Sequence, residues 1–259
     1  MTQAPADRRA QLAANLAAVR ARIAAACAAA GRPAEAVGLV AVTKFFPAAD
    51  VLHLIALGLR VFGENRDQEA AAKAAEVAEV AADIAAQTGP NLADVTSVPL
   101  PEWRFIGQLQ TNKVKSVVSY ADVVESVDRL PLVAALAKAA DRAGRPIRVL
   151  VQVNLDPEAV RDGAGRGGAH PQELLRIADA VTESGTLRLE GLMAVAPLAA
   201  PPEPAFARLA ALAGQLRGAH PDAVSLSAGM SGDLEAAVAA GATHVRIGSA
   251  LLGGRPPLR

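Results

Sequence analysis

The hydrophobic and polar positions divide the chain into short apolar runs separated by longer amphipathic stretches. The first stretch, residues 7–30, has apolar residues at a helical period and ends at Gly31 and Pro33, so it predicts a long helix. The run VGLVAVTK at 37–44 is almost continuously apolar and rich in valine. Such a run is typical of a strand that is buried on both faces, as in a parallel sheet.

The same alternation continues to the end of the chain. Further strands are predicted at 61–65, 103–107, 122–128, 147–155, 188–195, 224–228 and 244–248, and further helices at 49–58, 66–87, 111–119, 129–143, 171–184, 203–218 and 232–240. Eight strands that alternate with helices within about 250 residues predict an α/β fold, a single (β/α)8 TIM barrel with an extra N-terminal helix. A doubly wound open sheet is the alternative with the same pattern.

The length favours one domain. The 259 residues suit a single large barrel domain, 1–259, with room for a sizeable core. Residues 70–101 are rich in alanine and then in proline, glycine and serine. We interpret this stretch as a surface insertion, an extended helix followed by a loop, rather than as a second domain.

Composition and charge exclude several classes of protein. Hydrophobic residues make up 52% of the chain and charged residues 20%, which excludes disorder as its main state. Aromatic residues are only 3%, and 26 basic side chains balance 26 acidic ones, so we expect no nucleic-acid partner and no membrane partner. The single cysteine, Cys27, excludes a disulfide framework and a cysteine metal cluster.

The ends and the apolar runs of the chain predict its location. The N-terminus lacks the apolar segment of a secretory signal, and no run of about eighteen uncharged apolar residues predicts a transmembrane helix. No apolar stripe exceeds what a core needs. We therefore expect a cytoplasmic monomer.

Lysine is rare, and one lysine ends a buried strand. The chain has five lysines, and Lys44 directly follows the apolar run of the first predicted strand. Partial burial of an amine lowers its pKa and frees it as a nucleophile for a carbonyl group. The alternative is a strand-end lysine whose amine reaches solvent. We expect the other four to be solvated on helices: Lys73, Lys113, Lys115 and Lys138.

Small and polar residues follow the other predicted strands. Functional groups of a barrel collect at the carboxyl ends of its strands. These ends are Lys44, Asn65, Gly107-Gln108, Asp128, Asn154, Met193, Ser227 and Gly248-Ser249. The loops SAGMSGD (227–233) and GSALLGG (248–254) offer hydroxyl and backbone N–H groups, and barrels frequently hold phosphate after strands seven and eight. We predict a phosphate site there; the alternative is that Ser227, Ser231 and Asp233 are helix caps.

An arginine lies inside the eighth predicted strand. Arg246 belongs to the run HVRIG and precedes Gly248 by two residues. A buried guanidinium without a partner is very costly, so Arg246 requires one. The sequence leaves two partners open: a carboxylate such as Glu64, or a ring nitrogen of a bound cofactor.

A glycine-rich segment matches a nucleotide-binding motif in form only. GAGRGG at 163–168 fits G-x-G-x-x-G, but it follows the fifth predicted strand, and DPEAVRD separates it from Leu155. We interpret it as a loop over the barrel mouth. The four histidines have no metal-ligand spacing, and no serine lies in a nucleophile elbow, which argues against a metal site and against Ser/His/Asp catalysis.

Five segments of the chain resemble one known family. They are VTKFFP around Lys44, FGEN at 62–65, WRFIGQLQTNK at 103–113, EGLMA at 190–194 and LSAGMSGDLEAAVAAGATHVRIGSALLG at 226–253. In this order they are similar to the YggS/PROSC family of pyridoxal phosphate homeostasis proteins, over residues 7 to 254. The resemblance implies the barrel of the alanine racemase type of pyridoxal phosphate protein (fold type III), with pyridoxal 5'-phosphate (PLP) as its cofactor.

The resemblance also implies residue roles at the cofactor ring. Lys44 would form the Schiff base with PLP, and Asn65 would lie near the ring. Arg246 would face the pyridine nitrogen. Because an arginine stays protonated, it would prevent full protonation of that nitrogen and weaken the cofactor as an electron sink.

Further roles concern the phosphate. The resemblance implies that Ser231, Gly248 and Ser249 hold the phosphate through hydroxyl and N–H groups. Met230 would flank them, and Ser227 is a weaker candidate.

The implied function is a PLP-binding protein that contributes to intracellular PLP homeostasis without established catalysis. Its partners would be PLP and the apoenzymes that require it. The alternatives are a low-activity PLP-dependent amino-acid racemase, or an interaction protein that has lost the cofactor. Racemases of this type take a tyrosine from a C-terminal β-domain, whereas the one tyrosine here, Tyr120, precedes the fourth predicted strand. Phe46 replaces a lysine that is frequent in relatives and is thought to assist cofactor transfer.

Overall fold

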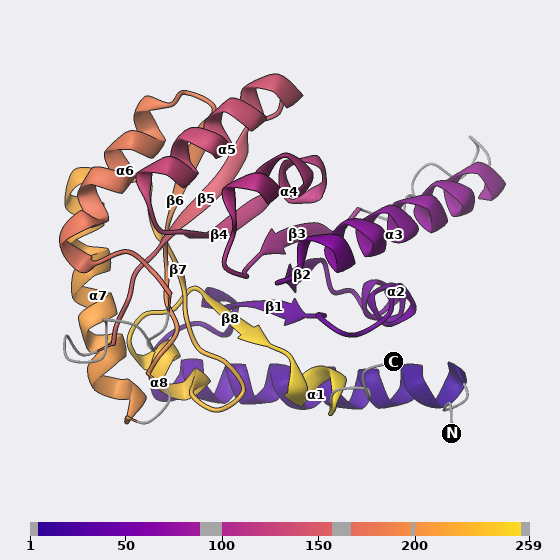
Figure 1. Cartoon of the computed structure of the whole chain (residues 1–259). Coiled ribbons are helices and arrows are strands. Elements are labelled where there is room, and N and C mark those ends of the chain that lie inside the picture. Colours follow the sequence, from indigo (N-terminus) through magenta and orange to yellow (C-terminus); the bar gives the residue numbers. More distant parts are fainter. Residues whose placement is uncertain (1–4, 89–99, 157–166, 198–199, 255–259) are drawn as a thin grey trace.

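Eight parallel strands close into a barrel in the computed structural model, which describes residues 5–88, 100–156, 167–197 and 200–254 (Figure 1). The strands follow one another around the barrel in chain order, and pairing of the first with the last closes the sheet. They are β1 (Gly38–Val42), β2 (Val61–Glu64), β3 (Glu102–Phe105), β4 (Val123–Val127), β5 (Ile147–Gln152), β6 (Leu187–Met193), β7 (Ser225–Ser227) and β8 (His244–Ile247). The closed barrel confirms the predicted TIM fold and excludes the open sheet.

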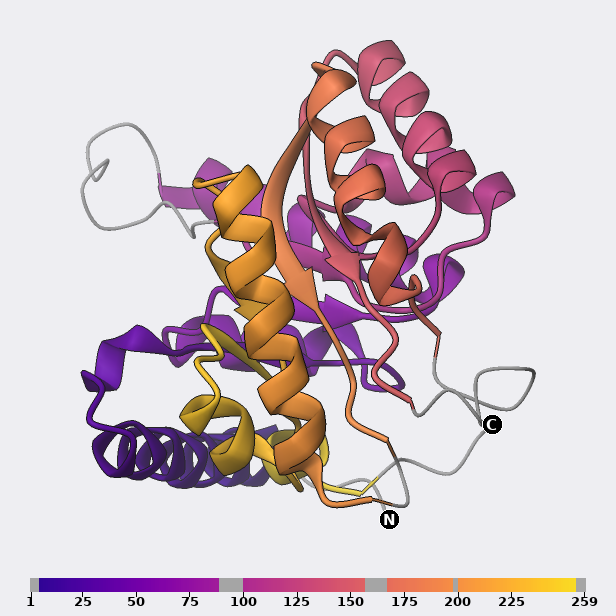
Figure 2. The same ribbon diagram turned by 90° about the vertical axis from the view of Figure 1, so that its left-hand side faces the viewer.

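Helices alternate with the strands and cover the outside of the barrel (Figure 2). They are α1 (Pro5–Ala29), α2 (Ala48–Ala56), α3 (Asp67–Thr88), α4 (Val114–Tyr120), α5 (Leu130–Ala143), α6 (Leu174–Glu183), α7 (Pro202–Ala219), α8 (Leu234–Ala239) and α9 (Ser249–Leu252). Short 3-10 turns also occur at 34–36, 111–113 and 171–173. Each predicted strand and helix has its counterpart within a few residues.

The N-terminal helix α1 completes the outer ring of helices. It contacts α8, α9 and α2, and it lies beside β1 and β8 in Figure 1. Helix α9, which follows β8, has only four residues and cannot cover the strands by itself. The buried face of α1, which includes Leu12, Leu16 and Ile23, packs into the same apolar cluster as residues of β1 and β8. α1 therefore takes the place of a full helix after the last strand.

Helix α1 is more apolar than the sequence analysis predicted, since no segment with the character of a transmembrane helix was expected. Asp7–Ala29 contains an 18-residue window of mean hydropathy 1.4, so by length and composition this helix is one that could cross a membrane. Alanine produces much of this value, because it raises hydropathy without adding bulk. The helix uses its larger apolar residues to pack on the barrel, while Arg22 forms an ion pair with Glu235 of α8.

Two sequence interpretations fall partly on residues that are not described. The first part of the stretch 70–101 is the helix α3, as expected, whereas 89–99 lie outside the described residues. Of the segment GAGRGG, only Gly167 and Gly168 are described. Its interpretation as a loop over the barrel mouth therefore stays a prediction.

Candidate functional site

One cavity at the carboxyl ends of the strands gathers six of the seven predicted cofactor residues. It has a volume of about 310 Å³ and lies between the end of β1, the loop that joins β7 to α8, and the β8–α9 turn. Apolar side chains, among them Val42, Phe46 and Ile106, form part of its wall. The predicted residues that line it are Lys44, Met230, Ser231, Arg246, Gly248 and Ser249.

Asn65 lies in a different hollow. It follows β2 and lines a second pocket of about 460 Å³ together with Gln108 and Lys113, among others. Its side-chain Oδ1 is buried and has no hydrogen-bond partner among the described residues. The backbone approaches Gly107 so closely that a Cβ there would lie 2.3 Å from the Asn65 carbonyl oxygen. This contact explains the glycine at the end of β3.

Two serine hydroxyls meet at one end of the Lys44 cavity. The Oγ atoms of Ser231 and Ser249 lie 3.5 Å apart, although their serines are 18 residues apart in the chain. The loop of Ser231 is shaped by Asp233, whose Oδ1 accepts a hydrogen bond from the Met230 N–H at 2.5 Å. Asp233 thus stabilises the loop rather than capping α8 with its side chain. The cavity therefore offers two hydroxyl groups, the backbone of Gly248, and two basic side chains, Lys44 and Arg246. Such donors suit a phosphate group.

Arg246 is held by partners that differ from the carboxylate expected from the sequence. Its guanidinium donates from Nη1 to Ser227 Oγ at 2.8 Å and from Nη2 to the Ala194 carbonyl at 2.7 Å. Among the described residues it forms an ion pair with Glu125 of β4, at 4.0 Å, and not with Glu64. Ser227 is fully buried and donates to Glu125 at 2.6 Å. Ser227 is therefore neither a helix cap nor a residue of the cavity lining; it fixes Arg246.

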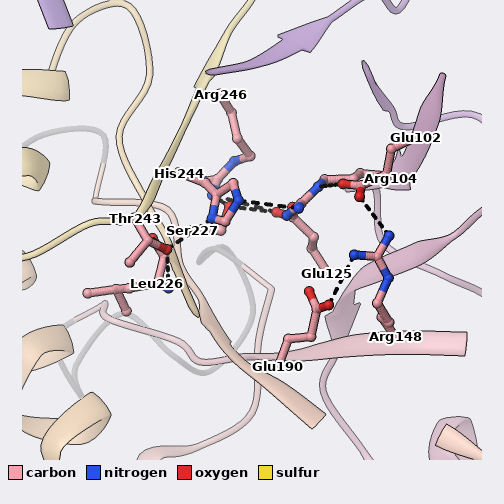
Figure 3. A network of polar contacts seen from close by, with 10 residues as sticks. All are labelled: Glu102, Arg104, Glu125, Arg148, Glu190, Leu226, Ser227, Thr243, His244 and Arg246. Atoms are coloured by element: carbon pink, nitrogen blue, oxygen red, sulfur yellow. Dashed lines mark hydrogen bonds and ion pairs between the residues drawn. The ribbon is translucent and has the colours of Figure 1, made fainter. Parts of the chain in front are cut away.

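Charges of alternating sign continue from Arg246 through the barrel interior (Figure 3). Glu125 also accepts a hydrogen bond from Arg104 at 3.0 Å, and Arg104 donates to Glu102 at 2.6 Å. Arg148 then joins Glu102 at 2.7 Å to Glu190 at 3.1 Å. Arg104, Arg246 and Glu125 are almost fully buried. Each of these buried side chains lies beside a group of opposite charge, which offsets part of the cost of removing it from water.

His244 borders this row of charges and is neutral. Its Nε2 lies 3.3 Å from Arg104 Nη2, so this nitrogen accepts the hydrogen bond and the proton is assigned to Nδ1, 2.9 Å from Thr243 Oγ1. Burial, and then the Arg104 charge, lower the pKa of His244 to about 4. The pKa of Glu102 is also lowered, but by charge: burial acts to raise it, and Arg104 and Arg148 together outweigh burial.

Lys73 was expected in solvent and is instead buried directly behind Lys44. Its side chain is 4% exposed, and Nζ lies 2.5 Å from Glu64 Oε1 and 2.8 Å from the Thr43 carbonyl oxygen. Thr43 Oγ1 also donates to Glu64, at 2.7 Å. Burial raises the pKa of Glu64, and Lys73 opposes that rise. The position of Lys73 on a predicted helix suggested a solvated side chain, but α3 turns this face toward the barrel.

Sequence reasoning missed the carboxylates that organise the site. Glu125 is the one charged residue within the apolar strand VVESV, a signal that a buried cation must lie nearby. Glu64 was considered only as a partner of Arg246. Among the described residues, no group of three or more His, Cys, Asp or Glu side chains is arranged to hold a metal ion.

Comparison with known proteins gives a consistent picture. Residues 14–256 match the family model of the alanine racemase N-terminal domain. The pyridoxal phosphate homeostasis protein of Mycobacterium leprae is 43% identical over 253 residues, which cover 95% of this chain and 94% of that protein. The corresponding protein of Mycobacterium tuberculosis (strain H37Rv) is 44% identical over 255 residues, 96% and 95% of the two chains. PipY of Synechococcus elongatus, solved with PLP bound, superposes with a TM-score of 0.75 at 32% identity, over 93% of this chain and 100% of that one.

Proposed function

The chain belongs to the pyridoxal phosphate homeostasis proteins, within the alanine racemase N-terminal domain family, and we propose that it binds PLP on Lys44 and releases it to apoenzymes that require it. The observation that carries the proposal is the single cavity that joins Lys44, Arg246 and the Ser231–Ser249 pair. PLP is held in the solved structure of PipY, a relative at 32% identity.

The residues present fit the cofactor. PLP supplies an aldehyde that an amine captures reversibly, together with an anionic phosphate and a pyridine nitrogen. The Lys44 amine would hold the aldehyde carbon, and the hydroxyls of Ser231 and Ser249, with the backbone N–H groups of Gly248 and Ser249, would hold the phosphate. Arg246 would donate to the ring nitrogen. Asn65 would act from the neighbouring pocket, and Met230 would pack beside the phosphate end.

The position of Tyr120 favours a carrier over a racemase. Two-sided exchange of an α-proton needs a second acid or base opposite the lysine. Tyr120 ends α4 and lines a cavity between α3 and α4 with Ala71 and Trp103, not the Lys44 cavity. Burial raises the pKa of its hydroxyl far above the ordinary value, so the phenolate that could accept a proton is scarcely formed, and the residue is also remote from Lys44.

Replacing Lys44 tests the proposed site. Lys44→Ala should abolish the near-visible absorption band that added PLP produces in the wild-type protein, while the melting temperature without PLP stays close to the wild-type value. Borohydride reduction and mass spectrometry should locate the adduct on Lys44. The control is Lys138→Ala, because Lys138 is exposed on α5. An adduct that persists on another lysine in Lys44→Ala would overturn the assignment, and a wild-type protein without a band would overturn PLP binding.

The racemase alternative has its own assay. Incubation of the PLP-loaded protein with L-alanine or L-serine, followed by chiral chromatography, should show no D-enantiomer above the level given by Lys44→Ala. Turnover that requires Lys44 would establish an enzyme instead.

A further inference from the structure

We propose that Glu69 and Lys73 clamp the two peptide groups beside Lys44 and thereby position its amine. Lys44 belongs to a tight turn at the end of β1, in which the Phe46 N–H donates to the Thr43 carbonyl at 3.1 Å. Lys44 and Phe45 are the two central residues of this turn. The inference rests on the proposed function of Lys44 and names the residues that support it.

The turn contains backbone strain next to the proposed nucleophile. Phe45 has a φ of 71°, and it is the one residue other than glycine with a positive φ among those the structure describes. Phe45 is the third of the four residues of the turn, a position at which a β-turn with positive φ favours glycine. A bulky residue keeps such a conformation only when its surroundings hold it there.

Helix α3 holds the turn on both sides of Lys44. Lys73 Nζ donates to the Thr43 carbonyl, the peptide group before Lys44, at 2.8 Å. Glu69 Oε1 accepts a short hydrogen bond from the Phe45 N–H, the peptide group after Lys44. Glu69 and Lys73 are one helical turn apart and also pair with each other at 3.2 Å. A rigid helix thus fixes the orientation of both peptide planes.

The direction of the Lys44 side chain depends on these two planes. Rotation of the peptide group before Lys44 changes its φ, and rotation of the group after it changes its ψ. Either change alters the direction in which the side chain points and so moves the amine. A displacement of about 1 Å at a reacting group can slow a reaction about a hundredfold. Glu64 fixes Lys73 in turn, with its Oε1 2.5 Å from Nζ. The buried Lys73–Glu64 pair therefore supports the reactive lysine as well as the core.

The rate of adduct formation tests positioning. The wild-type protein, Glu69→Ala, Glu69→Gln and the exposed control Glu76→Ala on the same helix are mixed with PLP alone, and the absorption band is followed across pH. We expect Glu69→Ala to slow the reaction at least about tenfold. Glu69→Gln should recover most of the rate, because its amide oxygen still accepts from the Phe45 N–H. Rates for Glu69→Ala within about twofold of the control at every pH would overturn the inference.

A second measurement needs no cofactor. Phe45→Gly removes the strain that Glu69 is proposed to restrain, so Glu69→Ala should destabilise the protein less in the Phe45→Gly background than in the wild type. Urea unfolding of the two single variants and the double variant measures this coupling. Additive effects would overturn the clamp. If the wild-type protein forms no adduct with PLP, the proposed function is wrong. The coupling energy between Glu69→Ala and Phe45→Gly would still test whether Glu69 restrains the turn.

Discussion

Behind the two basic residues of the cavity, Lys44 and Arg246, lie two buried carboxylates that are not among the residues lining it. Glu125 fixes Arg246 through Ser227, and Glu64 fixes Lys73 behind Lys44. A buried cation needs a partner of opposite charge, and a group that acts on a ligand must also point in the right direction. Glu125 and Glu64 compensate the charges of Arg246 and Lys73, and the hydrogen bonds around them fix how these side chains point.

The depressed pKa of His244 predicts how stability depends on pH. The folded protein takes up the proton at about pH 4, whereas the unfolded chain does so at the ordinary value of 6.5. Between these values the unfolded chain binds more protons, so the free energy of unfolding falls as the pH drops. His244→Gln should reduce the stability loss between pH 7 and pH 4.5 by about 2 kcal/mol, as measured by urea unfolding.

The comparison between wild type and variant isolates this one group. The raised pKa of Glu64 acts in the opposite sense, favouring the folded state as the pH falls, and it is common to both proteins. Equal pH dependence in the two proteins would show that His244 takes up its proton without a penalty in the folded barrel.

At the scale of the elements, α1 compensates for the short helix α9. A barrel strand needs an apolar cover on its outer face, and four residues of helix after β8 are too few to provide it. Helix α1 fills this gap by packing against α8 and α2, and it also contacts α9. The side chain of Arg8 donates to the Leu252 carbonyl at 3.0 Å, and Asn15 donates to the Leu251 carbonyl at 2.9 Å. These contacts anchor the turn that carries Ser249.

Truncation of the α1 packing face should destabilise the whole barrel. Leu16 is 3% exposed in the apolar cluster of α1, β1 and β8. Leu16→Ala should lower the free energy of unfolding by about 2–4 kcal/mol, since it removes buried methyl groups and leaves a cavity. Arg9→Ala, an exposed substitution on the same helix, should change it by less than about 0.5 kcal/mol. Similar urea midpoints for the two variants would mean that α1 is not part of the cooperative fold.

At the scale of the whole molecule, we predict a monomer from the described surface. Among the described residues, the exposed large hydrophobic side chains are Leu100 and Val224. Stable dimers bury apolar patches that this part of the surface does not offer. We predict that sedimentation equilibrium gives a mass near 26.4 kDa at micromolar concentration, with and without PLP. A mass near twice this value would contradict the prediction and show that the protein forms a dimer.

The sequence by itself determined the alternation of strands and helices, and it predicted the barrel with an open sheet as the alternative. The roles of the proposed cofactor residues came from the family resemblance. A valine-rich run such as 37–44 needs apolar cover on both faces of its sheet, and the small residues after β7 and β8 each lie within one loop. Local pattern is sufficient for such features, because each depends on residues close in the chain. Lys44 was identifiable because a lysine that ends a buried apolar strand brings its amine to the same edge of the barrel as the other strand ends.

Only the tertiary structure decided how the charges are paired. Lys73 has the spacing of a solvated helix residue, yet closure of the barrel places α3 over the end of β1 and buries its amine against Glu64 and the Thr43 carbonyl. Likewise, Arg246 and Glu125 lie 121 positions apart and meet only because eight strands share one interior. Ion pairs across a barrel depend on strand register and side-chain direction in the folded state, and neither leaves a periodic pattern in the chain.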